Sequence, residues 1–269
     1  LFSFMIYWWR TETNDKVRQM EKKETMFAEE RKNKILQMLN ENNKLRVPDL
    51  CSAFHVSPAT IRNDLRELES CGLLQRTHGG ALSNQKTRFE LNSYQKEISQ
   101  HAEKQAIARF AANLVEDGDT IAIDTGTTTL EFARLLGTKR DITVVTNDIQ
   151  IASQLEQSTG ANVILIGGIL RKGFHCAIGP AAVRMLEEFS VDKAFLATNG
   201  ISLEKGLTTP DMNQAEIKKA MIQIAGEVIV LCDSSKFGNK AFVQVAPVSA
   251  IGRIVTDQNV DERDLKAFQ

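Results

Sequence analysis

Residues 124–129, with the sequence Asp-Thr-Gly-Thr-Thr-Thr, carry groups that could bind an anion. Gly126 would let the backbone approach a ligand closely, and the threonines after it offer hydroxyl groups. A helix that begins here would add free backbone N–H groups, and together these groups suit a phosphate. The loop is neither a Walker A motif nor a dinucleotide-binding motif, because no lysine follows and no further glycine is present. A simple helix start has the same composition, so both interpretations stay open.

Similar polar turns follow a series of apolar segments that we predict to be strands. These segments are residues 120–124, 142–146, 162–168, 193–201, 227–233 and 252–257. Helical patterns separate the first of them, and this alternation predicts a mainly parallel sheet with helices on both faces. Ligands bind such sheets at the carboxyl ends of the strands. The polar residues expected there are Asp124, Asn147, Gly168, Arg171, Asn199 and Lys236.

Catalytic chemistry at this edge would need an acid and a base beside the reacting atoms. Asp124, Glu216 and Asp233 could serve, but no histidine falls at a strand end, so we expect no catalytic residue and no enzyme. A helix from Asn213 carries Lys218, which could reach the same edge. The four cysteines lie far apart without a CxxC pair, which predicts neither a metal site nor a cofactor and fits a cytoplasmic protein.

A second set of chemically active residues lies on a predicted helix at 57–69. Ile61, Leu65 and Leu68 recur with helical spacing on one side. The opposite side holds Ala59, Arg62, Asn63 and Arg66, of which arginine and asparagine suit guanine and adenine in the major groove. Ser57 can cap the helix, and Pro58 suits its first turn. The net charge is −1, so any contact with DNA must come from a local patch.

The elements that would position this helix are also visible in the sequence. Helical patterns at 29–41 and 47–54 precede it, and His55 and Val56 leave room only for a tight turn. This arrangement is typical of a helix-turn-helix. Residues 73–81 then predict a two-stranded wing, with Arg76 and His78 placed to contact phosphate or the minor groove. A small helical domain that binds protein is the alternative.

These motifs resemble the DeoR family of bacterial transcriptional regulators. Arg31, Ile35 and Leu39, followed by residues 57–65, match the family's signature. The resemblance implies that residues 45–64 form a DNA-binding helix-turn-helix, and Asp64 is expected to hold a basic neighbour. The expected DNA-binding residues are Arg46, Ser57, Ala59, Thr60, Arg62, Asn63, Arg66, Arg76 and His78.

The second half of the chain resembles the same family through its segments DTGTTT, TND, AEIKKAM and DSSKFG. The family's larger domain is similar in fold to ribose-5-phosphate isomerase and glucosamine-6-phosphate deaminase, and its effectors are phosphorylated sugars or their relatives. The resemblance implies that phosphate binds at Gly126, Thr127 and Thr128, with Lys218 and Lys236 as charge partners. It assigns Asp124, Asn147, Arg171 and Asn199 to the sugar. Relatives usually continue past residue 269 into a last strand, so we expect an unfilled sheet edge or a shortened chain.

The sequence therefore predicts an N-terminal winged helix-turn-helix domain, residues 28–83, joined by a linker, residues 84–100, to an effector-sensing α/β domain, residues 101–269. Residues 1–27 are expected to be a non-native or disordered leader, since their apolar run is too short to span a membrane. The predicted function is repression of a carbohydrate-utilisation operon under control of a phosphorylated sugar. The alternative is a sugar-phosphate isomerase or deaminase with a DNA-binding module. Expected partners are a double-stranded operator, the effector and, because one winged helix reads one half-site, a second copy in a homodimer or homotetramer.

Overall fold

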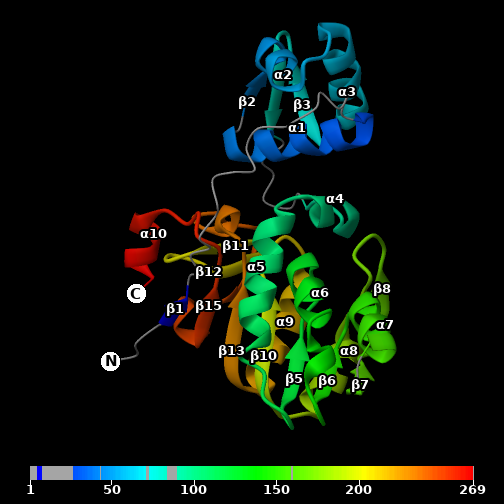
Figure 1. Cartoon of the computed structure of the whole chain (residues 1–269), viewed down its shortest axis with the longest axis vertical. Helices are drawn as coiled ribbons and strands as arrows, with labels where there is room; N and C mark the ends of the chain where they lie inside the picture. Colours follow the sequence, from blue (N-terminus) through cyan, green and yellow to red (C-terminus); the bar gives the residue numbers. More distant parts are fainter. Residues whose placement is uncertain are drawn as a thin grey trace. The chain divides into compact units, whose positions relative to one another are not determined.

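The computed structural model describes residues 5–7, 27–42, 44–70, 73–83, 90–158 and 160–268. The chain forms two units, one made of residues 11–89 and one made of residues 1–10 with 90–269. We describe each unit by itself (Figure 1).

The smaller unit is a winged helix-turn-helix, as predicted. Its elements are α1 (Ala28–Asn42), β2 (Lys44–Arg46), α2 (Val47–Phe54), α3 (Pro58–Ser70), β3 (Leu74–Thr77) and β4 (Gly80–Ser83). The strands form an antiparallel sheet in the order β2-β4-β3, so the wing has a third strand, β2, that the periodicity did not predict. Three residues are too few to show an alternating pattern.

Local residues explain the geometry of the helix-turn-helix. His55 has φ of 54° in the left-handed region, which ends α2 and turns the chain. Ser57 Oγ then accepts a hydrogen bond from the Thr60 N–H at 3.2 Å, as expected of a helix cap. Ile61 and Leu65 of α3 are fully buried, so the predicted apolar stripe is the side that packs on the domain.

A buried ion pair joins the first and last helices of this unit. Arg31 Nε donates to Asp64 Oδ2 at 2.6 Å, and Arg31 Nη2 donates to Asp64 Oδ1 at 3.1 Å. Both side chains are less than a tenth exposed. The expectation that Asp64 holds a basic neighbour is therefore confirmed, and α3 is fixed to α1 by a two-point contact.

The larger unit contains the parallel sheet that the alternation predicted. Its helices are α4 (Ser93–Ile98), α5 (His101–Ala112), α6 (Thr127–Ala133), α7 (Ile149–Ser158), α8 (Pro180–Glu187), α9 (Met212–Ile224) and α10 (Glu262–Ala267). Its strands are β1 (Met5–Tyr7), β5 (Thr120–Ile123), β6 (Thr143–Thr146), β7 (Asn162–Leu165), β8 (Ile169–Arg171), β9 (Cys176–Ile178), β10 (Val191–Ala197), β11 (Gly200–Ser202), β12 (Gly206–Thr209), β13 (Ala225–Leu231), β14 (Val243–Ala246) and β15 (Arg253–Val255).

The main sheet has the strand order β1-β15-β13-β10-β5-β6-β7 with parallel pairing throughout. One apolar cluster, with α5, α6 and α7, fills one face, and a second, with α8 and α9, fills the other (Figure 1). Neighbouring residues of one strand alternate between them: Phe195 of β10 belongs to the first and Leu196 to the second. Burial on both faces explains why these strands are continuous apolar runs. An antiparallel sheet β11-β12-β14 and a hairpin β8-β9 complete the unit.

The ends of the larger unit differ from the sequence expectations in two places. Met5–Tyr7, within the predicted leader, form strand β1 and pair with Arg253–Val255 of β15. The edge expected to be unfilled thus carries a strand, while the rest of residues 1–26 lies outside the described residues. Glu90–Gln100, the end of the expected linker, belong to the larger unit, and the helix that the linker could end in is α4. Residues 84–89 also lie outside the described residues. No helix in the described part of the chain is long and apolar enough to cross a membrane.

Candidate functional site

The outward side of α3 carries the predicted recognition residues. Ala59, Arg62, Asn63 and Arg66 are exposed, and Arg62 makes no ion pair with the described residues. Asn63 Nδ2 donates to Glu67 Oε1 at 2.8 Å, and Arg66 Nη1 donates to Asn63 Oδ1 at 3.2 Å. Asn63 and Arg66 must therefore exchange these surface contacts before they can bind a base, whereas Arg62 is available at once.

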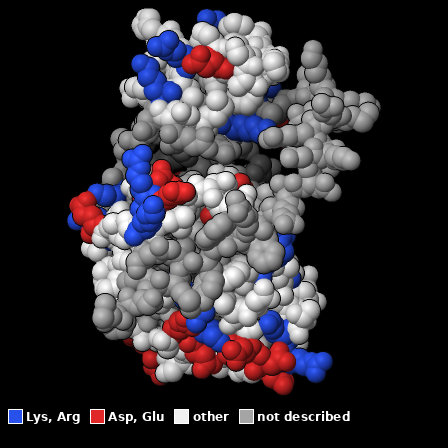
Figure 2. Space-filling view, turned by 60° about the vertical axis from the view of Figure 1, so that its left-hand side comes forward, with Lys and Arg blue, Asp and Glu red and all other residues white. Residues whose placement is uncertain are grey.

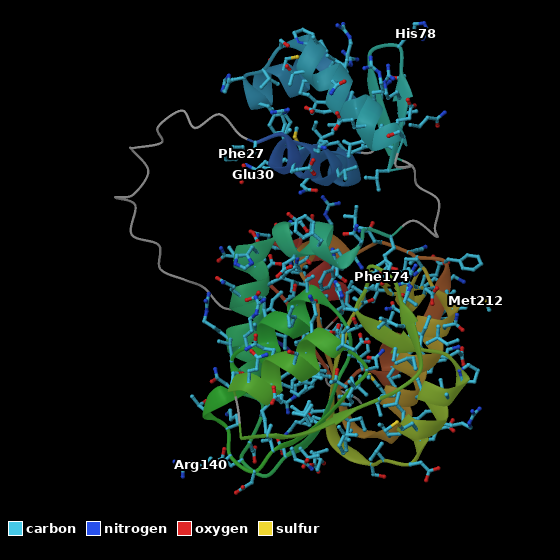
Figure 3. The ribbon with its side chains drawn as sticks, turned by 90° about the vertical axis from the view of Figure 1, so that its right-hand side faces the viewer. Phe27, Glu30, His78, Arg140, Phe174 and Met212 are labelled. Atoms are coloured by element: carbon cyan, nitrogen blue, oxygen red, sulfur yellow. The ribbon has the colours of Figure 1, made fainter. Side chains whose placement is uncertain are left out.

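The other predicted DNA-binding residues lie at the start of this helix, on β2 and on the wing. The hydroxyl groups of Thr60 and Ser57 are hydrogen-bonded to each other at 2.9 Å, so both side chains stabilise the start of α3. Arg46, at the end of β2, is exposed. On the wing, Glu69 accepts from the Arg76 backbone N–H at 2.9 Å and lies 3.4 Å from its guanidinium, while Figure 3 shows His78 at the tip of the β3–β4 hairpin, pointing away from the domain.

Charge is distributed unevenly over each unit. On the visible face of the smaller unit in Figure 2, basic side chains make up most of the charged surface. On the larger unit, acidic side chains gather at the bottom end in the same view, which is the end of Arg140 in Figure 3. The overall charge near zero thus hides local patches, as the sequence argument required.

The carboxyl ends of β5 and β6 face a small pocket beneath α4. Gly126 and Thr127 line it from the loop after β5, and Asp148 lines it from the loop after β6. The remaining lining residues are Ser93, Tyr94, Glu97, Leu130, Gln150 and His175. We call this cavity the strand-end pocket. Thr128, the third residue assigned to phosphate, is buried and does not line it.

Asp124 and Lys218 form a buried ion pair behind this pocket. Lys218 Nζ donates to Asp124 Oδ2 and, at 2.8 Å, to the Ala197 carbonyl, while the Ala197 N–H donates to Asp124 Oδ2 at 3.1 Å. Burial raises the pKa of the Asp124 carboxyl, although the Lys218 ammonium opposes this effect. The pair links β5, β10 and α9, so Lys218 is already neutralised by a carboxylate.

Lys236, unlike Lys218, has access to solvent. Its ammonium lies 3.5 Å from an oxygen of Asp233 and donates to Ser235 Oγ at 2.9 Å, and its side chain is 32 % exposed. Solvent access leaves it able to meet an incoming anion.

Two other predicted residues hold the backbone in place. Asn147 is fully buried, and its Nδ2 donates to the Ala177 carbonyl at 2.8 Å, which fixes β9 against the end of β6. Its Oδ1 has no hydrogen-bond partner among the described residues. At Gly168 a Cβ would lie 2.7 Å from the Ile178 carbonyl oxygen, so only glycine fits this approach of the two segments.

Arg171 and Asn199 meet at Glu90, which the sequence analysis placed in a linker. Glu90 Oε1 accepts from Lys96 Nζ at 2.6 Å and from Asn199 Nδ2 at 2.9 Å, and Oε2 lies 2.9 Å from Arg171 Nη2. Burial alone would raise the pKa of Glu90, but the charges of Lys96 and Arg171 outweigh it and keep that pKa below its ordinary value. Glu90 is thus an ionised carboxylate inside the domain.

Glu90, Lys96 and His175 are the residues at the strand ends that sequence reasoning missed. Lys96 and Glu90 lie in a polar stretch without clear periodicity, so the sequence pattern gives no signal for them. No histidine was expected at a strand end, yet His175 lines the strand-end pocket, with φ of 57°.

The chain combines a winged helix-turn-helix with an α/β domain that gathers polar groups at its strand ends. This combination defines a two-domain transcriptional regulator. Two family models match the chain: the DeoR-like helix-turn-helix domain over residues 31–87 and the DeoR C terminal sensor domain over residues 99–258. The chain belongs to the DeoR family of transcriptional regulators.

Relatives that cover almost the whole chain carry names of the same kind. The HTH-type transcriptional regulator YulB of Bacillus subtilis is 37 % identical over 91 % of this chain and 94 % of its own length. The transcriptional repressor AccR of Agrobacterium fabrum is 35 % identical over 86 % of this chain and 90 % of its own. The putative aga operon transcriptional repressor of Escherichia coli O157:H7 is 32 % identical over 89 % and 90 %. These names agree with the expectation that the chain is not an enzyme.

Solved structures resemble the chain more distantly. Ribose 5-phosphate isomerase A of Methanocaldococcus jannaschii is 22 % identical, with a TM-score of 0.39 over 52 % of this chain and 55 % of its own.

Proposed function

We propose that the protein is a repressor of a carbohydrate-utilisation operon and that a phosphorylated sugar bound by the larger unit controls its hold on DNA. The observation that carries the proposal is the meeting of cationic side chains and a polar pocket at one edge of the sheet. Lys96 and Arg171 share the Glu90 carboxylate, Lys236 follows β13 and has access to solvent, and Gly126 and Thr127 line the strand-end pocket. Cations and free hydroxyl groups suit a phosphorylated polyol better than an apolar ligand.

The relatives support repression as the mode of regulation. Two of them are named as repressors, and one of these names contains an operon. A repressor must bind DNA in one ligand state more tightly than in the other, which requires the effector to prefer one conformation. A coupling of about 1–3 kcal/mol is enough for regulation.

A homodimer or homotetramer follows from the geometry of recognition. One winged helix reads one half-site, and palindromic operators match the two-fold symmetry of a dimer. Sedimentation of the protein with a duplex that carries one or two half-sites measures this directly: a duplex with two half-sites should bind two chains of a homodimer or four of a homotetramer, and never a single chain.

Thr127→Asp tests the effector part of the proposal. The substitution places a carboxylate in the strand-end pocket, where it repels a phosphate. Duplexes selected from a random pool by the wild-type protein provide the operator, and a panel of sugar phosphates is titrated against the complex. The variant should bind the duplex as the wild type does and lose the response. Ser153→Asp adds the same charge on an exposed position of α7 and should respond normally. A normal response of Thr127→Asp would place the effector elsewhere.

A further inference from the structure

The carboxylate of Glu90 is an anion that the fold holds at the strand ends. Its side chain is only 5 % exposed. Its three partners belong to α4, β8 and the turn after β10, and Asn199 is 109 positions away in the chain. We call Lys96, Arg171 and Asn199 the Glu90 site. The site is therefore a tertiary construction and not a local feature of the linker.

The two cations of the Glu90 site rest on an aromatic platform. The Arg171 guanidinium lies 3.7 Å from the centroid of the Phe174 ring, and Lys96 Nζ lies 5.6 Å from it. Attraction between a cation and the face of an aromatic ring does not depend on Glu90. Phe174 lies at the α4 end of the larger unit in Figure 3. The platform thus keeps the cations close together when their carboxylate leaves.

The Glu90 carboxylate leaves one donor of the Glu90 site without a hydrogen-bond partner among the described residues. Arg171 Nη1 is buried and has no hydrogen-bond partner in the described part of the chain. Glu90 Oε2 forms an ion pair with Nη2 without a hydrogen bond to any described residue. Asp211 lies 3.8 Å from Arg171 Nε, but it also caps α9 by accepting from the Gln214 N–H at 2.9 Å. A group with more acceptor oxygens and more charge than a carboxylate would satisfy the spare donor.

Glu90 can also be replaced without passing through the core. The Lys96 side chain is 29 % exposed, so solvent reaches one side of the site. The site is near the strand-end pocket, because a Cβ on Gly126 would lie 2.7 Å from Ala197 Cβ and Asn199 follows Ala197 by two residues. Two residues span at most about 7 Å. A small molecule in the pocket can reach this site.

We propose that the Glu90 site is a second oxyanion subsite for the effector, which Glu90 occupies until a phosphate displaces it. The inference rests on the proposed function and says how Lys96 and Arg171 become available to the effector. It also links the ligand to the boundary between the two units, because residue 89 is the last of the smaller unit and Glu90 begins the main segment of the larger one. An oxyanion that releases Glu90 removes the contacts that hold the first residue of this segment, and by reciprocity any change that favours release of Glu90 raises the affinity for the oxyanion.

The test is calorimetric titration of the full chain with inorganic phosphate. Glu90→Gln keeps the shape of the side chain and removes the competing charge. If the carboxylate fills the site 90–99 % of the time, its removal should tighten phosphate binding by about 10–100-fold. Lys96→Met in the Glu90→Gln protein should abolish this gain. Glu156→Gln, an exposed glutamate of α7, is the matched control and should bind as the wild type does.

Thermal melting without phosphate separates competition from a structural role. Glu90→Gln loses an ion pair, so a lower melting temperature together with tighter phosphate binding supports the proposal, whereas a structural role alone lowers both stability and affinity. Equal affinity of wild type and Glu90→Gln overturns the proposal, as does absent binding in both or a gain that survives Lys96→Met. Operator binding and its response to sugar phosphates are measured separately, so failure of this inference is distinguishable from failure of the proposed function.

Discussion

Removal of the Asp64 carboxylate should unfold the DNA-binding unit selectively. Asp64→Ala leaves the Arg31 guanidinium, whose side chain is 8 % exposed, without its bidentate partner. Breaking a buried pair from one side costs about 3–5 kcal/mol. A domain of residues 28–83 has a total stability of roughly 3–8 kcal/mol at the usual value per residue. The loss therefore consumes most of the stability of this unit.

Differential scanning calorimetry and operator binding give the two readouts. The transition of the smaller unit should move far down in temperature or disappear, while the transition of the larger unit stays where it is. Specific DNA binding should fall with the lost unit. Asp49→Ala, which removes an exposed acid from α2, should leave both transitions unchanged.

A double variant separates the ion pair from the space it fills. Replacing both partners of a buried pair by apolar residues of similar volume is often neutral. Arg31→Met with Asp64→Leu should therefore recover much of the stability that Asp64→Ala loses. An Asp64→Ala protein that melts like the wild type would refute the reasoning, since it would show that the pair contributes nothing to the fold.

Three further predictions concern Arg62 on α3, and Lys218 and Lys104 in the larger unit. Arg62→Ala should weaken operator binding by about 1–3 kcal/mol per half-site without a change in melting temperature, whereas Lys34→Ala, an exposed control on α1, should keep its affinity; equal behaviour of the two removes α3 as the reading surface. Lys218→Met should destabilise the larger unit by about 3–5 kcal/mol, because Asp124 stays buried without its cation, whereas Lys219→Met breaks only an exposed pair with Glu216 worth about 0–1 kcal/mol; equal melting temperatures contradict this. Burial lowers the pKa of Lys104 to about 8, against about 10.4 in an unfolded chain, so the unfolded state binds more protons between these values and stability should rise with pH there by at most about 3 kcal/mol. Denaturant unfolding across this window should show the rise in the wild type and lose it in Lys104→Met, and an unchanged slope in the variant contradicts the assignment.

Sequence alone predicted the parts of the protein that depend on neighbours in the chain. The stripe of Ile61, Leu65 and Leu68, the cap at Ser57 and the turn at His55 are local features, and the helix-turn-helix was placed from them. The alternation of apolar runs and helices likewise predicted the parallel sheet and the edge at which its polar turns gather. Periodicity and capping act within a few residues, so a single sequence displays them.

Tertiary structure alone decided which charged groups meet. Lys218 was expected to face a phosphate, yet the fold pairs it with Asp124, 94 positions away. Arg171 and Asn199 were expected to contact a sugar, and the fold brings both to Glu90, in a segment with no helical or strand pattern. Coulombic attraction depends on the distance between two charges, and desolvation depends on how deeply each is buried. Both are set only when the sheet forms, so the spacing of residues along the chain does not reveal them.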